Sequence, residues 1–378
     1  MYTETKRVEY LDSIRGLAAL FVLLSHTIGA FDWPPAYFAV TRLPFVSILF
    51  NGKESVCMFF VLSGFVLSKP YVPSAGNSVP RKLFLPTFYL MRLTRIWLPW
   101  FFIFVASILA KKYLFAHPVT DPPVSKWLNA FWQGNMNVAE FFRQCAYLQH
   151  DASRQLLNQD WSLGVELKGS ALIPLFLFLL PGKRIALLGV MAAGLAVFLG
   201  TGHYYVSFII GVLLAWQADG ITRWLGTRAW VSKALLLLAG LTLYQTYSLL
   251  PGWFQDTKLI SKTGWIASSL GCALILMAVF GSRTLQRCLS HGPFVFLGKI
   301  SYSVYLLQFI VILCLLPPLV HLLNGWGVTS RPDLFALALL ASVAATIVGS
   351  AITYRLVEVP AINIGHRSTK ALQGLLQK

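Results

Sequence analysis

The sequence predicts an all-α fold, a polytopic transmembrane helical bundle. Hydrophobic residues make up 56% of the 378 residues and charged residues only 12%, whereas soluble domains average about half and about a quarter. Apolar runs near the ~20-residue length that crosses the hydrocarbon core recur along the chain, and the mean hydropathy is +0.65. Because lipid offers the backbone no hydrogen-bond partner, we expect these runs to be helices.

Ten apolar segments predict about ten spans. They lie at residues 12–30, 54–70, 93–115, 162–180, 185–200, 202–219, 233–251, 264–281, 298–320 and 334–356. The fifth and sixth are short and only a GTGH stretch separates them, so counts of eight or eleven spans stay open. We interpret residues 1–360 as a single transmembrane domain, and residues 361–378 as a short basic cytoplasmic tail.

The distribution of Lys and Arg predicts the orientation. With the N-terminus inside, the cytoplasmic loops hold 19 of these residues and the opposite loops hold 10. Half of those ten lie in the long loop at 111–154, where charge has little influence on orientation. Both termini are therefore expected in the cytoplasm.

The formal charge of +17 does not indicate nucleic-acid binding, because the basic residues form short tracts between apolar runs instead of one face. Anionic membrane lipids and the excess of positive charge in cytoplasmic loops explain that spacing better. The five cysteines form no C-x-x-C pair and no metal-ligand spacing, so we expect no metal site.

Polar residues of the first segment form one stripe. Asp12, Arg15, Ala19, Val22 and His26 are three or four residues apart, so they share a helix face. A rise of about 1.5 Å per residue separates Arg15 from His26 by roughly 16 Å, with Arg15 near the cytoplasm. Ionisable groups within spans are costly and indicate function. The alternative is an interfacial Asp12–Arg15 ion pair or helix cap, with His26 as a packing residue.

Two arginines mark the start of the third segment. Arg92 and Arg95 are three residues apart and share a helix face at the expected cytoplasmic mouth. Two guanidinium groups there suit the phosphates of an anionic soluble ligand, because each binds phosphate through paired hydrogen bonds. An orientation signal paired with lipid headgroups is the alternative.

A carboxylate lies about one turn into the fourth segment. Glu166 is expected at a depth similar to that of His26, since this segment starts on the far side of the membrane. A carboxylate beside an imidazole fixes its tautomer and raises its basicity, as general-base catalysis requires. A local arrangement with Lys168 is the alternative, although side chains two residues apart diverge on a helix.

The ninth segment carries a polar strip. Ser301, Tyr305 and Gln308 are four and three residues apart, so they share one face. Such strips commonly hold membrane helices together. The functional alternative is that these side chains line the same cavity as His26.

Five stretches of the sequence together resemble the acyltransferase-3 family of integral membrane acyltransferases. They are YLDSIRGLAALFVLLSH, FFVLSGFVLS, RLTRIW, WSLGVE and ISYSVYLLQ, in this order over about 300 residues. No single stretch is decisive, but five in register are highly specific. The resemblance is to members without a fused SGNH-type esterase domain.

The resemblance implies about ten spans in a bacterial cytoplasmic (inner) membrane, and a cytoplasmic acyl-coenzyme A donor, with acetyl-coenzyme A expected. It implies transfer of the acyl group to a hydroxyl of a carbohydrate or glycoconjugate. The family's catalytic histidine corresponds to His26 and its W-S-L-x-x-E glutamate to Glu166. Its coenzyme-binding arginines correspond to Arg15, Arg92 and Arg95.

The chain departs from the family pattern at two places. Lys168 and Gly169 follow Glu166 where a glutamine, phenylalanine or tyrosine pattern is usual. Gln308 stands where the ninth-segment motif often ends in histidine, so any role of that histidine is absent.

These observations together predict an O-acyltransferase in which His26 acts as general base or as acyl relay, with Glu166 orienting the imidazole. A transporter or flippase is the alternative function, using the same buried charges as proton relay or substrate ligands. The sequence has no inverted repeat and no paired broken helices to support that alternative.

Overall fold

The fold was analysed in a computed structural model of the chain. It describes residues 8–33, 39–73, 84–115, 124–125, 127–134, 136–147, 155–180, 184–197, 202–246 and 258–376. Several basic residues behind the orientation prediction, including Lys6 and Arg7, lie outside this range.

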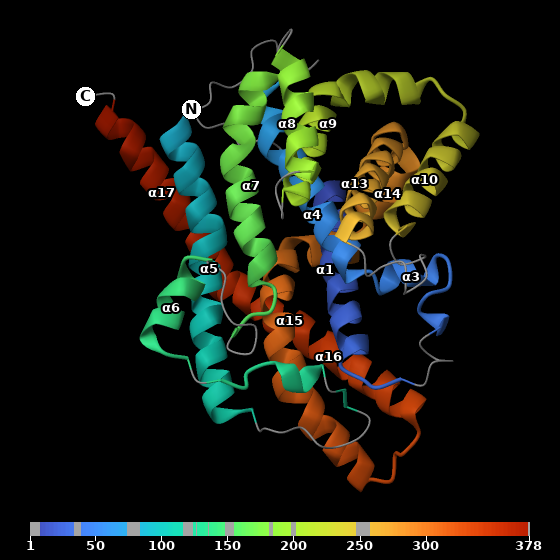
Figure 1. Ribbon diagram of the computed structural model, residues 1–378, viewed down its shortest axis with the longest axis vertical. Coiled ribbons are helices and arrows are strands. Elements are labelled where there is room, and N and C mark those ends of the chain that lie inside the picture. The colour runs from blue at the N-terminus through green and yellow to red at the C-terminus, as the bar shows by residue number, and fades with distance from the viewer. Residues whose placement is uncertain are drawn as a thin grey trace. The chain divides into compact units, whose positions relative to one another are not determined.

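The described chain is helical almost throughout, as predicted (Figure 1). The helices up to residue 145 are α1 (Glu9–Gly29), α3 (Val46–Leu49), α4 (Gly52–Ser68), η1 (Lys69–Tyr71), α5 (Leu85–Tyr113), η2 (Leu128–Ala130) and α6 (Val138–Cys145). Those from residue 160 to 289 are α7 (Asp160–Leu179), α8 (Arg184–Val197), α9 (His203–Gly226), α10 (Trp230–Tyr244), α13 (Lys258–Gly281) and α14 (Arg283–Leu289). The last are α15 (Gly292–Gly325), α16 (Arg331–Thr353), the π-helix η4 (Tyr354–Glu358) and α17 (Val359–Leu376).

Each of the ten apolar segments falls on a helix, but several helices, α5 and α15 most of all, are longer than the apolar pattern indicated. Helix α5 begins at Leu85, eight residues before the predicted start, because the helix continues through the polar turn that carries Arg92. Helix α15 runs from Gly292 to Gly325 and contains two consecutive prolines. Hydrophobicity marks the part of a helix suited to lipid, not the full hydrogen-bonded element.

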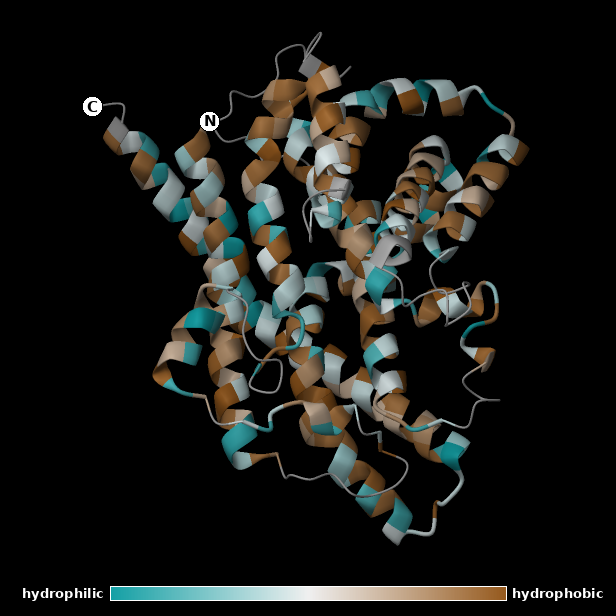
Figure 2. Cartoon of the chain, viewed as in Figure 1, coloured by the Kyte–Doolittle hydropathy of each residue, from teal (hydrophilic) through white to brown (hydrophobic). Residues whose placement is uncertain are grey.

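Seven of the described helices are long and apolar enough to cross a membrane, counting α16 to α17 as one. Helices α8 and α10 are apolar but shorter, and α4 has 17 residues. Hydrophobic residues dominate α7 and α8, while hydrophilic ones recur along α17 (Figure 2). The protein is thus a helical membrane bundle, and the count of ten spans with two cytoplasmic ends stays a prediction.

The chain divides into two compact units. Unit 1 comprises Met1–Ala18, Arg42–Leu85 and Val165–Lys299. Unit 2 comprises Ala19–Thr41, Pro86–Gly164 and Ile300–Lys378. Helices α1, α7 and α15 contribute residues to both units, so the residues predicted to form the site are shared between them.

Unit 1 is built around α4, α9, α10 and α13, and glycines let their backbones approach closely. A Cβ atom on Gly211 of α9 would overlap the carbonyl oxygen of Val61 on α4. The first turns of α1 contact the start of α15 in the same way, at Gly16 and Gly298. Small residues at such crossings are how membrane helices gain dispersion contacts in the absence of a hydrophobic driving force.

A buried polar network crosses the interior of unit 1. The indole nitrogen of Trp265 donates to Ser207 Oγ at 2.9 Å. Ser207 Oγ is 2.8 Å from Ser269 Oγ, which is 3.0 Å from the thiol of Cys57. Hydrogen bonds between α4, α9 and α13 thereby supplement the close helix packing.

Unit 2 is formed by the second half of α1, by α5 with α6, and by α15 to α17. The small residue Gly365 lets α17 pack against Thr94 and Met91 of α5. Ser303 of α15 donates to the buried Glu358 of the π-helix η4 at 2.9 Å. The residues from 361 onward, expected to form a short basic cytoplasmic tail, are helical as far as Leu376, and their location in the cytoplasm stays a prediction.

Candidate functional site

The N-terminal half of the α1 stripe contains an ion pair. Arg15 Nη1 lies 3.4 Å from Asp12 Oδ1, and Asp12 is buried while Arg15 is partly exposed. The three-residue spacing that predicted a shared face brings these two side chains together. The Asp12–Arg15 pair that the sequence left open thus exists, whereas its position at a membrane interface stays a prediction.

His26 of α1 is set among aromatic rings of unit 2. Its ring stacks on Trp127 with centroids 6.0 Å apart and meets the edge of Phe309 at 6.1 Å. Phe131 completes the group, 4.8 Å from Trp127 and 4.7 Å from Phe309. The Nδ1 atom of His26 is buried and has no hydrogen-bond partner, which is costly for a polar group.

Ser125 is held against the end of α1. Ser125 donates its backbone N–H to the Ala30 carbonyl at 2.9 Å and its Oγ–H to the Gly29 carbonyl at 2.8 Å. These are terminal carbonyls that the helix leaves without an intrahelical donor. Capping them positions Trp127, two residues further along, over the imidazole of His26.

Two of the three predicted polar residues of α15 lie in a buried polar cluster. Tyr305 Oη is 2.5 Å from Ser162 Oγ of α7. Gln159 donates its side-chain amide to the carbonyls of Tyr305 and Leu306, at 3.2 and 2.8 Å. The strip therefore does hold α7 and α15 together, and the WSLGVE and ISYSVYLLQ stretches meet in unit 2.

Gln308 reaches His26 from α15. Its side chain is buried and interacts with the imidazole, while its Nε2 donates to the Tyr305 carbonyl at 3.1 Å. Ser301, the third member of the strip, is buried in unit 2. Of the three, Gln308 is the one that the structure brings to the candidate catalytic histidine.

Arg92 and Arg95 both lie on α5, one turn apart as predicted. Arg95 is exposed and Arg92 is partly buried. Met91 and Thr94, the residues that precede them, contact α17 at Gly365. The Arg95 side chain is thus accessible to a ligand from solvent, whereas the Arg92 side chain is partly covered by the protein.

Glu166 lies on α7 with its side chain partly exposed. It belongs to unit 1, whereas His26 belongs to unit 2. The pairing of this carboxylate with the imidazole stays a prediction. No group of three or more His, Cys, Asp and Glu side chains is placed to hold a metal ion within the described ranges.

Sequence reasoning missed a buried carboxylate at the start of α7. Asp160 accepts a hydrogen bond from the indole nitrogen of Trp100 at 2.7 Å, and its Oδ2 atom has no partner. Tyr147 packs on Trp100 with centroids 4.8 Å apart, and burial raises the pKa of its phenol well above the ordinary value. The sequence does place an acidic residue directly before WSLGVE, but an acidic residue there is equally typical of a helix cap.

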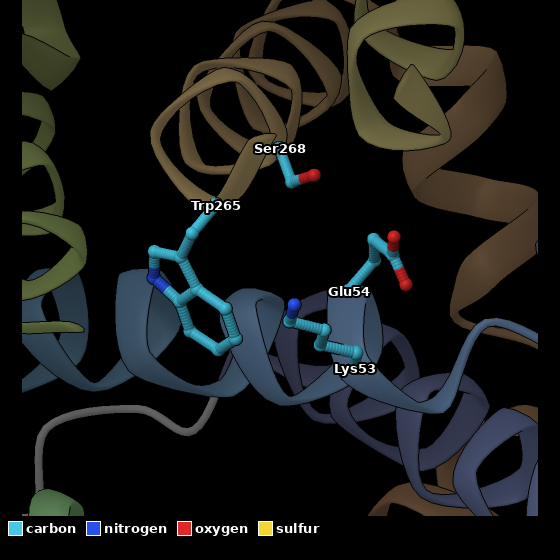
Figure 3. Close-up of a pocket in the computed structure, with 4 residues that line it drawn as sticks. All are labelled: Lys53, Glu54, Trp265 and Ser268. Atoms are coloured by element: carbon cyan, nitrogen blue, oxygen red, sulfur yellow. The ribbon is translucent and has the colours of Figure 1, made fainter. Parts of the chain in front are cut away.

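A second unforeseen carboxylate lies in unit 1. Glu54 is only 3% exposed, and its Oε1 atom has no hydrogen-bond partner. It lines a small hollow with Lys53 of α4 and with Trp265 and Ser268 of α13 (Figure 3). Its position at the edge of an apolar segment made it resemble an ordinary interfacial residue.

A sequence-family model described as an acyltransferase domain, that of the acyltransferase-3 family, matches residues 8–355 of this chain. The chain belongs to the acyltransferase-3 family. The match includes α1 with His26, the Arg92–Arg95 turn, the α7 carboxylates and α15. The resemblance seen in the five sequence stretches is therefore confirmed.

Two curated acyltransferase-3 relatives show the range of similarity. O-acetyltransferase OatA of Staphylococcus aureus (strain NCTC 8325 / PS 47) is 22% identical over 382 residues, covering 93% of this chain and 56% of the relative. Putative peptidoglycan O-acetyltransferase YrhL of Bacillus subtilis (strain 168) is 25% identical over 356 residues, covering 84% and 51%. The chain thus spans about half the length of these relatives. No solved structure matches it.

Proposed function

We propose that the protein is a membrane-embedded O-acyltransferase that moves an acyl group, acetyl in the first instance, from acyl-coenzyme A to a carbohydrate hydroxyl. The observation that carries the proposal is His26, whose partly buried imidazole has an unpartnered nitrogen in an acyltransferase-3 chain. The names of the relatives support acetyl as the group, and the name of YrhL supports a glycan as the acceptor.

The donor is proposed to bind through its phosphates at the cytoplasmic ends of the helices. Arg92 and Arg95 present two guanidinium groups from one side of α5, and Arg15 adds a third, partly neutralised by Asp12. Guanidinium groups suit this role because they bind phosphate oxygens in pairs and stay charged. The slender pantetheine arm would then extend toward the depth of His26.

The chemical step is proposed to use His26 as general base. The imidazole takes the proton of the acceptor hydroxyl while its oxygen attacks the thioester carbonyl carbon. The carbon–sulfur bond then breaks, and the thiolate of coenzyme A takes up the proton from the imidazolium. An acyl-histidine relay is the alternative route. In it, the imidazole attacks the thioester first and passes the acyl group to the hydroxyl in a second step.

Glu166 is proposed to stabilise the imidazolium that forms during transfer, as the sequence suggested. The acceptor is proposed to arrive from the far side of a bacterial cytoplasmic membrane, where glycans are assembled. Ser301, Tyr305 and Asp12 are proposed as supporting residues that position the helices around the path.

The test is release of free thiol from acetyl-coenzyme A by purified protein supplied with soluble glycan fragments. His26→Ala should lower the rate by about 10²- to 10⁴-fold, the usual contribution of a general base. His321→Ala, which changes a histidine on the exposed side of α15, is the matched control and should keep the rate. Full turnover by His26→Ala would refute the proposed mechanism.

The acceptor can be identified in cells. Envelope glycans from cells with the intact gene should carry one acyl unit more, by mass spectrometry, than those from cells that express His26→Ala. Equal masses, together with transport of an unmodified glycan, would favour a transporter.

A further inference from the structure

Two buried polar atoms without partners belong to side chains that interact with each other in unit 2. His26 Nδ1 and Gln308 Oε1 each have no hydrogen-bond partner, although the two side chains interact. Phe309, the next residue of α15, contacts the imidazole edge at 6.1 Å and fixes the separation of α1 and α15 at this level. A hydrogen bond from the imidazole N–H to the amide oxygen would satisfy both atoms.

The orientation of the Gln308 amide is set by its other end. Its Nε2 donates to the Tyr305 carbonyl at 3.1 Å, and that same carbonyl accepts from Gln159 at 3.2 Å. The nitrogen is thereby held on the backbone of α15, and the oxygen is left for the imidazole. An amide oxygen has no proton to give, so it can only accept.

We propose that Gln308 is the positioning residue of His26, accepting a hydrogen bond from Nδ1–H so that Nε2 is the basic nitrogen. A neutral imidazole carries its proton on one nitrogen only, and the partner of that nitrogen selects the tautomer. This inference rests on the proposed function, because it assumes that His26 acts as a base or nucleophile. It gives the proton-accepting nitrogen a defined position opposite the Gln308 side.

The orienting role, which the sequence analysis predicted for Glu166, thereby falls to a neutral group. In unit 2 the imidazole contacts Trp127, Phe309 and Gln308, the last two from α15. The group that can direct one of its nitrogens among these three is the neutral amide of Gln308. An amide directs the imidazole without burying a negative charge, which avoids a large desolvation cost.

The test uses three variants assayed for thiol release across a range of pH. Gln308→Leu removes the acceptor, and we expect kcat to fall at least about tenfold with little change in KM for the donor, because the imidazole loses its preferred tautomer, its fixed orientation and the acceptor that stabilises the Nδ1–H of the imidazolium. Gln308→Glu keeps the acceptor and adds a charge. Gln217→Glu makes the same change at an exposed position of α9 and is the control.

Gln308→Glu should retain more activity than Gln308→Leu and should move the acidic limb of the rate profile about one pH unit upward. The reason is that a carboxylate beside the ring stabilises imidazolium, so protonation of the base persists to higher pH. An acidic limb that stays at its wild-type pH in Gln308→Glu, or a wild-type kcat in Gln308→Leu, would overturn the proposal. A shift in Glu166→Gln alone would assign the role to Glu166 instead.

A spectroscopic readout separates this inference from the proposed function and from simple misfolding. In protein labelled with ¹⁵N-histidine, the signals lost in His26→Ala identify the His26 ring. They should report a protonated Nδ1 in the wild type and a mixture of tautomers in Gln308→Leu. The same tautomer ratio in both would refute the role of Gln308 even if His26 proved essential for turnover. Conversely, a turnover-competent His26→Ala would refute the mechanism while leaving the tautomer result intact.

Discussion

At the scale of single residues, similar side chains differ in their surroundings. Arg92 and Arg95 are one turn apart on α5, yet one is partly buried and the other exposed. The planar guanidinium group makes paired hydrogen bonds that a lysine ammonium cannot reproduce. If both arginines bind donor phosphates, the shape of the cation matters as well as its charge.

Arg92→Lys and Arg95→Lys should therefore each raise KM for acetyl-coenzyme A by about tenfold, with a smaller change in kcat, because paired contacts are lost and charge is kept. The measurement is the initial rate of thiol release at varied donor concentration. Arg143→Lys, at an exposed site on α6, is the control. An unchanged KM in both α5 variants would restrict these arginines to orienting the protein in the membrane.

At the scale of helices, the packing of unit 1 depends on glycines that the sequence pattern did not single out. Gly64 of α4 and Gly211 of α9 face the backbone of the opposite helix. Gly189 of α8 has nothing within 4 Å of its added Cβ. The same substitution should thus have different outcomes in these two apolar helices.

Gly211→Ala should destabilise the protein by about 1–3 kcal/mol, the usual cost of overpacking, because the added methyl meets the Val61 carbonyl. Gly189→Ala should leave stability unchanged. The midpoint of thermal unfolding in detergent, followed by loss of monodisperse protein, measures both. Equal midpoints for the two variants would mean that α4 and α9 pack less closely than described here.

Hydrophobicity and spacing predicted much of this architecture. Every apolar segment proved helical, and the three- and four-residue spacings placed Asp12 beside Arg15 and kept Arg92 near Arg95. These predictions succeeded because they concern residues on one helix, where 3.6 residues per turn fixes the geometry.

Contacts between elements could not be predicted in this way. Trp127 reaches His26 from a polar loop, and no periodic pattern in that loop indicates which helix end it caps. The buried carboxylates of Glu54, Asp160 and Glu358 lie at the borders of apolar segments. At such borders, an acidic residue is equally compatible with water, a helix cap or the interior.

At the scale of the whole molecule, orientation in the membrane is open to a direct test. Cys288 is an exposed free cysteine of α14, on the side expected to face the cytoplasm. The positive-inside distribution predicts that a membrane-impermeant maleimide will not reach it in right-side-out vesicles. Arg143→Cys, on α6 of the opposite side, should be labelled in the same vesicles.

The labelling experiment is best performed with Cys145 and Cys314 changed to serine, since both are partly accessible. Inverted vesicles should reverse the pattern. Labelling of Cys288 in right-side-out vesicles would reverse the assigned topology, and with it the side from which the donor must come.

The anchoring of Ser125 has a consequence for fidelity. Trp127 and Phe131 form an aromatic wall beside His26. This wall is held against α1 through Ser125, whose side chain supplies one of the two hydrogen bonds to the helix end. Ser125→Ala would loosen that wall and admit water, a nucleophile present at about 55 M that competes with every alcohol. The enzyme should then waste donor by hydrolysis, visible as thiol release that exceeds acylated glycan. A single serine hydroxyl would in this way decide how much of each acyl group reaches sugar.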